Sequence, residues 1–445
     1  MVSNMTEGRP LRLILGFALP MLVGNIFQQV YNVVDASVVG HYVGPNALAA
    51  VGATGGVTMF LVALMMGLTN GAGIIIAQCF GSKNFISMKK AVVALIYIVG
   101  VLTVVTSVAG VFFSESVLKV LGTPPEVLAE AKGYMQVQFA FMAGTALYNT
   151  CGAILRSIGD SKTPLYVLII ASVINVALDL LFVVKFHWGV VGAAYATVIS
   201  QSFSAILCAF YIFYRRRQLS LDGLVWRVNG IMVKKIFQTG IPAALESCLI
   251  SLGTMSVQSL VNSFGAMTIA AYTAATRIDA IAIAPIVSVG SALSVFTGQN
   301  IGAGKIGRIK KGLKQTLGVM LVVCAVLAVG ILIFKRQLLS LFLNPAEAAE
   351  AIQIGSTYLS IIGIAYMIAA VMRSYLNVIR GAGDVNSSAL AGIMELGGRI
   401  LFAYLLVRPF GATGIWIATP LAWAMGASVP VIRYYSGKWK TKKLV

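Results

Sequence analysis

Residues 11–40 read LRLILGFALPMLVGNIFQQVYNVVDASVVG. The apolar run that opens at Leu11 is long enough to cross a bilayer as a helix, because about 20 such residues span the hydrocarbon core. The second half of the stretch nevertheless contains polar side chains and an aspartate, Asp35. An aspartate at mid-membrane costs about 2.5–3.5 kcal/mol on insertion scales, so such a residue usually faces protein or water and has a function.

Apolar runs of similar length follow one another through all 445 residues of the chain. The chain is 58% hydrophobic and 11% charged, whereas a soluble domain carries about 25% charged residues. A membrane barrel would instead show short alternating segments of about ten residues. The pattern predicts an all-α polytopic membrane protein with twelve transmembrane helices. The spans begin near Leu11, Ala47, Lys90, Val127, Pro164, Gly189, Met232, Thr268, Leu313, Ala351, Ser388 and Gly411.

The net charge of +19 is distributed unevenly over the loops. With twelve spans, 24 of the 33 basic residues fall on one side of the membrane and 6 on the other, while Arg277, Arg373 and Arg399 fall in or at the ends of spans. This bias follows the positive-inside rule and predicts a protein of the plasma membrane with both termini in the cytoplasm. The basic residues are therefore expected to set the topology and to contact anionic lipid. Since these roles account for the positive charge, no nucleic-acid partner is expected.

The two halves of the sequence repeat one plan. At a shift of 221 residues, residues 78–81 fall on residues 299–302, and Lys89-Lys90 falls on Lys310-Lys311. After a small slip, RSIGD at 156–160 matches RGAGD at 380–384. We therefore predict two pseudo-symmetric six-helix lobes, 1–214 and 236–445, joined by a cytoplasmic linker at 215–235. Parallel repeats of this kind occur in secondary transporters, with the binding site at the repeat interface.

A polar stripe surrounds the first acid. Asn25, Gln28, Asn32 and Asp35 recur at spacings of three and four, on one face of a helix. Four polar groups on one face of a span indicate a hydrated wall, and we predict that Asn25, Gln28 and Asn32 contact substrate. The alternative is a buried network of hydrogen bonds between helices with no ligand.

A second polar pair lies in the fifth span. Asn175 and Asp179 are four residues apart and therefore share a helix face. A carboxylate and an amide oxygen suit a hard monovalent cation, or a carboxylate that takes up a proton, and Thr197 of the sixth span would add a hydroxyl oxygen. The alternative is a packing contact between helices.

The second half carries a different set of candidates. The repeat places Glu246 at the position of Asn25 and Ser256 at that of Asp35. Glu246 is predicted to neutralise a cationic substrate or to carry a proton, and the alternative is a silent pair with an arginine or the backbone. Met66 and Met255 are predicted to offer an adaptable apolar wall to substrates, although such residues are more often core. Glu395 and Arg399 are expected to form a structural ion pair.

The residues from 32 to 50, NVVDASVVGHYVGPNALAA, resemble the first-span signature of the multidrug and toxic compound extrusion (MATE) transporters. Pro20, QCFG at 78–81, RSIGD at 156–160, NVALD at 175–179 and GVVGAAYAT at 189–197 fit the same pattern. The resemblance covers essentially the whole chain, and the motifs are specific when taken together.

The resemblance implies a two-lobed exporter of twelve helices that alternates between inward-open and outward-open states. Members of this family expel mostly cationic, amphipathic compounds, driven by the inward flow of Na⁺ or H⁺. The first-lobe cation site of the bacterial members corresponds to Asp35, Asn175, Asp179 and Thr197, and all four are present. The acidic second-lobe site of one branch is not clearly reproduced, because the tenth span has Tyr366 and Arg373 but no acid.

We therefore expect a multidrug efflux antiporter rather than an enzyme, since no nucleophile–base or metal-ligand motif is evident in the sequence. Its expected partners are small cationic substrates and membrane lipids, it is expected to be a monomer, and it is expected to need no cofactor besides the coupling ion, Na⁺ or H⁺. The alternatives are a flippase of lipid-linked precursors from the same superfamily and an exporter of one specific metabolite.

Overall fold

The computed structural model describes residues 3–344 and 348–444. Within these ranges the chain forms thirteen α-helices, a π-helix and a 3₁₀-helix, and no strand. Eleven of the helices are long and apolar enough to cross a membrane. The predicted all-α polytopic membrane fold is therefore confirmed.

The elements of the first half are α1 (Pro10–Tyr42), α2 (Pro45–Gly81), α3 (Phe85–Val120), α4 (Pro125–Ala140), α5 (Met142–Ser157), α6 (Lys162–Asp179), the π-helix η1 (Leu180–Lys185) and α7 (Gly189–Tyr214). Those of the second half are α8 (Gly230–Asn262), α9 (Ala266–Gly302), α10 (Ile306–Ser340), α11 (Ala349–Gly381), α12 (Val385–Phe410), α13 (Ala412–Tyr435) and the 3₁₀-helix η2 (Lys438–Thr441). The repeat is visible in the lengths, since α1 and α8 both have 33 residues, and α2 and α9 both have 37.

The span predicted to begin near Val127 is divided into two helices. Phe141 interrupts it with φ −109° and ψ 18°, which leaves α4 and α5 with 16 residues each. Each piece is too short to count as a span by itself, so eleven helices rather than twelve meet that length. In the second half the corresponding helix, α11, continues for 33 residues without a break.

The chain divides into two compact units. Unit 1 contains the described residues up to Asn4 together with Val23–Ile241, and unit 2 contains Met5–Leu22 and the described residues from Pro242 onward. The chain crosses between the units three times; the crossing after Asn4 precedes α1, and the other two lie inside a helix and close to a proline, Pro20 in α1 and Pro242 in α8. The segment at 215–235, predicted as a linker, belongs to unit 1. Residues 1–2 and 445, at the ends of the predicted lobes, lie outside the described residues.

The repeated motif that ends in Gly-Asp starts a helix in each unit. Asp160 Oδ1 accepts hydrogen bonds from the backbone N–H groups of Lys162 (3.1 Å) and Thr163 (3.0 Å) at the start of α6. Asp384, which precedes α12, accepts one from Ser387 Oγ at 3.1 Å. The preceding Gly159 and Gly383 have φ of +94° and +98°, a conformation that side chains disfavour. Asp160 therefore caps the start of α6, whereas the carboxylate of Asp384 forms an ion pair with Arg433 of α13.

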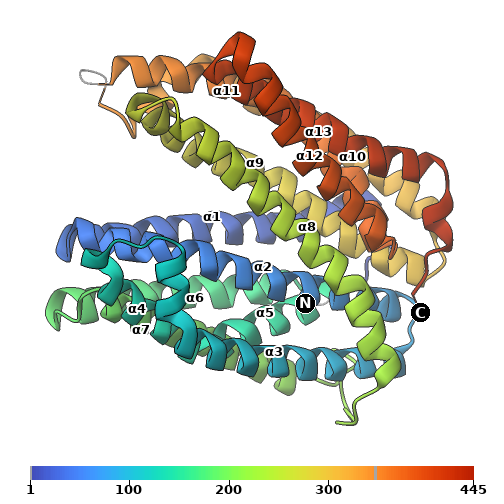
Figure 1. Cartoon of the computed structure of the whole chain (residues 1–445). Coiled ribbons are helices and arrows are strands. Elements are labelled where there is room, and N and C mark those ends of the chain that lie inside the picture. Colours follow the sequence, from blue (N-terminus) through green and yellow to red (C-terminus); the bar gives the residue numbers. More distant parts are fainter. Residues whose placement is uncertain (1–2, 345–347, 445) are drawn as a thin grey trace. The chain divides into compact units, whose positions relative to one another are not determined.

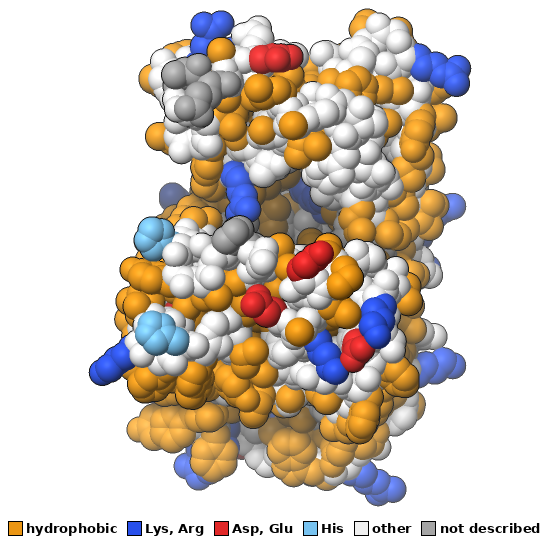
Figure 2. Space-filling model, turned by 60° about the vertical axis from the view of Figure 1, so that its left-hand side comes forward, with side chains coloured by type: hydrophobic (Ala, Val, Ile, Leu, Met, Phe, Trp, Pro, Cys, Tyr) orange, Lys and Arg blue, Asp and Glu red, His pale blue; other side chains and the backbone are white. Residues whose placement is uncertain are grey.

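Each unit is built from long helices packed side by side. In unit 1, α7 packs against α4, α5 and α6, and in unit 2, α12 runs beside α13 (Figure 1). Large hydrophobic side chains remain exposed along many of these helices. On the face drawn in Figure 2, hydrophobic side chains are widespread and charged side chains are scattered. Such a surface suits contact with lipid.

Candidate functional site

Two carboxyl groups from different helices meet in unit 1. Asp35 lies on α1 and Asp179 is the last residue of α6, and the two side chains interact directly. Asp179 is fully buried. Among the described residues, no hydrogen-bond donor reaches Asp35 Oδ1 or either carboxyl oxygen of Asp179. Their charges therefore have no partner within the part of the chain that the structure describes.

The two other predicted ligands of the cation site lie in the same unit. Asn175, one helical turn before Asp179, is buried, and neither its amide oxygen nor its amide nitrogen has a partner among the described residues. Thr197 on α7 is also buried, and its hydroxyl accepts a hydrogen bond from the Tyr31 hydroxyl at 3.4 Å. Tyr31 precedes Asp35 by one turn of α1, so it links Thr197 to the helix that carries Asp35.

Two side chains near the carboxyl pair were not among the sequence-based candidates. Tyr31 and Tyr134 both lie within electrostatic range of Asp35 and Asp179, and Gln138 donates a hydrogen bond to the Tyr134 hydroxyl at 3.3 Å. Tyr31 lies four residues before Asp35, and this spacing, which places both side chains on one face of α1, could have identified it from the sequence. Tyr134 lies on α4, about a hundred residues away in sequence, and no spacing rule could have linked it to Asp35.

The backbone is irregular at this site. The π-helix η1 begins directly after Asp179 and includes residues 180–185, whereas α12 of the second half has no such interruption among its described residues. Single π-turns are often found at functional sites. The divided α4–α5 segment, which carries Tyr134, belongs to the same unit. The π-helix η1 therefore adjoins the carboxyl pair directly.

The chemistry of this cluster is that of an acceptor for positive charge. In the described chain neither Asp35 nor Asp179 forms an ion pair with an arginine, lysine or histidine. Two carboxylates in direct contact cannot both remain charged without a compensating cation or proton. Asn175, one turn before Asp179, adds an amide oxygen, and Thr197, hydrogen-bonded to Tyr31, adds a hydroxyl oxygen. The cluster therefore offers ligands for Na⁺ or a place for a proton.

The stripe on α1 has a more open setting. Asn25 and Asn32 are exposed and Gln28 is half-buried, and Gln28 donates a hydrogen bond to Asn32 at 3.4 Å. These three side chains therefore lie where a soluble or lipid-borne molecule can reach them. Their assignment to substrate binding stays a prediction.

The two methionines belong to different units. Met66 on α2 is 42% exposed and Met255 on α8 is 63% exposed. Met65, the neighbour of Met66, is buried. Neither exposed methionine is part of the cluster around Asp35, and their contact with substrate stays a prediction.

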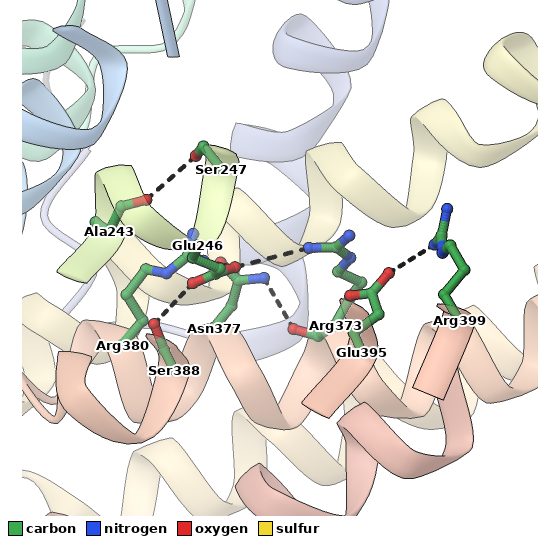
Figure 3. A network of polar contacts seen from close by, with 9 residues as sticks. All are labelled: Ala243, Glu246, Ser247, Arg373, Asn377, Arg380, Ser388, Glu395 and Arg399. Carbon is green, nitrogen blue, oxygen red and sulfur yellow. Dashed lines mark hydrogen bonds and ion pairs between the residues drawn. The ribbon is translucent and has the colours of Figure 1, made fainter. Parts of the chain in front are cut away.

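Glu246 of unit 2 lies in a network of charged side chains (Figure 3). Its carboxylate is buried, forms an ion pair with Arg380 of α11 and accepts a hydrogen bond from Ser388 of α12 at 2.8 Å. Arg373 approaches the same carboxylate at 3.9 Å. These contacts favour the structural alternative for Glu246, a side chain that joins α8 to two neighbouring helices.

The two other acids within the predicted spans of unit 2, Glu395 and Asp279, also have partners. Glu395 and Arg399 form an ion pair at 2.9 Å on α12, as their spacing indicates. Tyr366 donates a hydrogen bond to Asp279 at 2.6 Å. Unit 2 therefore surrounds its acids with arginine and tyrosine side chains, whereas unit 1 places two acids against each other.

Comparison with known proteins gives a consistent result. The family model described as MatE matches residues 20–181 and 242–434. The probable multidrug resistance protein YoeA of Bacillus subtilis (strain 168) is 31% identical over 442 residues, which covers 96% of this chain and 94% of that protein. The probable multidrug resistance protein YpnP of the same organism is 29% identical over 444 residues, which covers 99% and 98%.

A solved structure shares the fold over nearly its full length. It is the outward-facing conformation of a multidrug resistance MATE family transporter of the MOP superfamily, with a TM-score of 0.90 and 24% identity. The match covers 99% of this chain and 98% of that one.

Proposed function

The chain belongs to the MATE family of membrane transporters, and we propose that it is a multidrug efflux antiporter that exports cationic amphipathic compounds in exchange for Na⁺ or H⁺. The observation that carries this proposal is the contact between Asp35 and Asp179 in unit 1. A buried carboxyl group, Asp179, and a half-buried one, Asp35, without a basic partner bind positive charge, and both a coupling ion and a cationic drug supply it.

The proposed mechanism is a competition for this negative charge. With the site empty and charged, a cationic compound is attracted electrostatically to the unit that carries Asp35. When Na⁺ or H⁺ reaches Asp35 and Asp179, the charge is neutralised and the attraction falls. Such a difference in affinity between two states is required, because a site that binds equally in both states cannot drive transport.

Replacement of the aspartate on α1 tests the proposal. Asp35→Asn removes the charge while keeping the size of the side chain, so we expect resistance and ethidium efflux to be abolished while the protein remains in the membrane. The matched control is Asp222→Asn, which changes an exposed acid of the segment after α7 that pairs with Lys89 at 3.6 Å. Ethidium efflux by Asp35→Asn at the wild-type rate would rule out the role of Asp35.

Separate gradients identify the coupling ion. In proteoliposomes loaded with ethidium, a Na⁺ gradient and a pH gradient are imposed one at a time. The gradient that drives efflux in the wild type, and fails to do so in Asp35→Asn, identifies the ion that this site binds. Efflux that responds to neither gradient would contradict antiport.

A lipid-linked precursor flippase would need cationic side chains for its anionic substrate. The arginines of the unit 2 network, Arg380 and Arg399, are engaged by Glu246 and Glu395, so drug export is the better supported proposal. We also propose that the protein lies in the plasma membrane with both termini in the cytoplasm, as the distribution of basic residues indicates.

A further inference from the structure

The turn that follows α7 carries three consecutive arginines, Arg215, Arg216 and Arg217, and all three are exposed. No ion pair within the described chain joins any of them to an acid. The nearby Asp222 pairs instead with Lys89, at 3.6 Å. Three positive charges are therefore gathered on one turn without a carboxylate to compensate them.

Neutral groups hold two of these guanidinium groups in place. Arg215 Nη1 donates a hydrogen bond to Gln218 Oε1 at 2.8 Å. Arg216 lies 4.4 Å from the ring centre of Phe213 and donates to the Phe213 carbonyl at 3.1 Å. A guanidinium over an aromatic face is stabilised by the ring quadrupole. The contacts orient the side chains without neutralising them.

The turn itself is anchored to unit 1. Leu219 and Leu221 are each only 1% exposed, and the Leu221 N–H donates a hydrogen bond to the Arg216 carbonyl at 2.7 Å. Because buried leucines fix its end, the turn presents the arginines from a defined backbone. The arginines are therefore not part of a loose tail.

A hollow of about 350 Å³ opens at this turn. Its lining residues are Tyr214, Arg215, Arg216, Arg217 and Gln218. Guanidinium groups match phosphate oxygens in charge and in the geometry of their N–H donors. The hollow therefore has the chemistry of a phosphate site.

Aromatic side chains flank the arginines on the side of the span. Phe210, Phe213 and Tyr214 in the last turns of α7 are between 64% and 71% exposed, and Trp226 further along the segment is 59% exposed. Aromatic residues gather where a membrane protein leaves the hydrocarbon region. A molecule bound here would meet arginines at its polar end and aromatic rings beside its apolar part.

The fold does not require this cluster. At a shift of 222, which aligns Gly189 with Gly411 at the start of the last span of each half, Arg215–Arg217 correspond to Gly437, Lys438 and Trp439 after α13. The second half therefore follows its last helix with separated lysines, Lys438, Lys440 and Lys442, where the first half has three consecutive arginines. A general need for positive charge beside a span does not account for that difference.

We propose that Arg215, Arg216 and Arg217 bind the phosphate-bearing headgroup of one anionic phospholipid, with its acyl chains beside Phe210 and Phe213. This site is separate from the carboxyl cluster of unit 1 and goes beyond the transport proposal. Charge complementarity identifies the occupant, because the uncompensated arginines require an anion and the exposed rings require an apolar chain.

The test measures lipid binding by the purified full-length protein. Phosphatidylglycerol is titrated into the protein in detergent, and bound lipid is counted by native mass spectrometry. The variant R215Q/R216Q/R217Q is compared with the control K438Q/K440Q/K442Q, which removes three positive charges after the last helix of the second half. A basic residue near an anionic lipid surface contributes a factor of about five in affinity, so the arginine variant should bind about 100-fold more weakly.

The outcomes separate the proposal from its rivals. Tight binding that is lost in the arginine variant and kept in the lysine control supports the proposal. Equal loss in both variants, or no loss in either, overturns it, because net charge alone or another site then explains binding. Phosphatidylcholine bound as tightly as phosphatidylglycerol also overturns it.

Two further measurements complete the test. Inorganic phosphate in excess should not displace the lipid, since it lacks the acyl chains, and full displacement would show a free-phosphate site and overturn the lipid assignment. If R215Q/R216Q/R217Q unfolds at a lower temperature than the wild type, the single variant Arg216→Gln replaces it, with an expected loss of about fivefold. Unchanged binding by that variant, in a fully folded protein, would contradict the assignment.

Discussion

The contact between Asp35 and Asp179 illustrates how the surroundings of a side chain decide its use. Five acids lie within the predicted spans, and in unit 2 Glu246, Glu395 and Asp279 are all engaged by arginine or tyrosine side chains. In unit 1 the acids of α1 and α6 face each other instead. A carboxylate that is bonded to an arginine or a tyrosine is stabilised by that partner. Two carboxylates that lie against each other need an ion or a proton instead.

Replacement of the buried acid on α6 should have the same effect as replacement of Asp35. In Asp179→Asn one carboxylate remains and can accept a hydrogen bond from the new amide, so the site loses one of its two negative charges and attracts a cation or a proton less strongly. We expect ethidium efflux to fall at least tenfold with unchanged protein in the membrane. Asp222→Asn again serves as the control, and full efflux in Asp179→Asn would contradict the paired-carboxyl site.

Glu246 allows the structural and the substrate-binding interpretations to be separated. Glu246→Gln leaves Arg380 without its charged partner, and breaking a buried ion pair from one side costs about 3–5 kcal/mol. We expect a lower unfolding temperature in detergent, with partial recovery in the double variant Glu246→Gln/Arg380→Gln. Efflux per folded molecule should persist in the double variant. Its loss there, despite restored stability, would indicate that Glu246 binds substrate.

At the scale of elements, the two halves of the chain differ in the regularity of their helices. The segment made by α4 and α5 is broken at Phe141, and η1 follows Asp179, while α11 and α12 run on in the second half. The sequence shows the length of each apolar run but not these irregularities. Gly144, just after the break, lies so close to Ser202 of α7 that a Cβ there would overlap the serine.

The packing of α3 against α4 predicts the effect of a single methyl group. A Cβ on Gly110 would overlap the ring of Phe139, whereas one on Gly100 of the same helix meets nothing within 4 Å. Gly110→Ala should therefore be destabilised by about 1–3 kcal/mol through overpacking. Gly100→Ala should be neutral or slightly stabilised, because alanine favours helix over glycine. Thermal unfolding of the two purified variants checks the difference, and equal stability would show that Phe139 moves freely.

At the scale of the whole molecule, the repeat accounts for the order and lengths of the long helices, and the charge bias predicts their direction across the membrane. The match of α1 to α8 and of α2 to α9 in length follows from that repeat. Three predicted spans, α4–α5, α6–η1 and α7, separate the turn after α3 from the turn after α7, so the two turns are predicted to lie on opposite sides. This arrangement can be tested without any assumption about transport.

Cysteine labelling checks the topology. In a variant whose five native cysteines are replaced by alanine, Leu121→Cys in the turn after α3 should react with a membrane-impermeant maleimide added to intact cells. Gln218→Cys, in the turn after α7, should react only after the cells are opened. Both positions are exposed, so a difference in labelling reports sidedness. Labelling of Gln218→Cys in intact cells would contradict cytoplasmic termini.

The sequence by itself determined the membrane class, the two-half plan and the candidate cation ligands. Apolar run length, the 221-residue shift and helical spacing are local or periodic signals, and they place Asp35, Asn175 and Asp179 on helix faces without a structure. Only the tertiary structure decided which acids meet. Helices distant in sequence bring Tyr134 close to Asp35 and place Arg380 against Glu246. The physical reason is that a carboxyl group's charge is compensated by its neighbours in space, and no spacing within one helix specifies them.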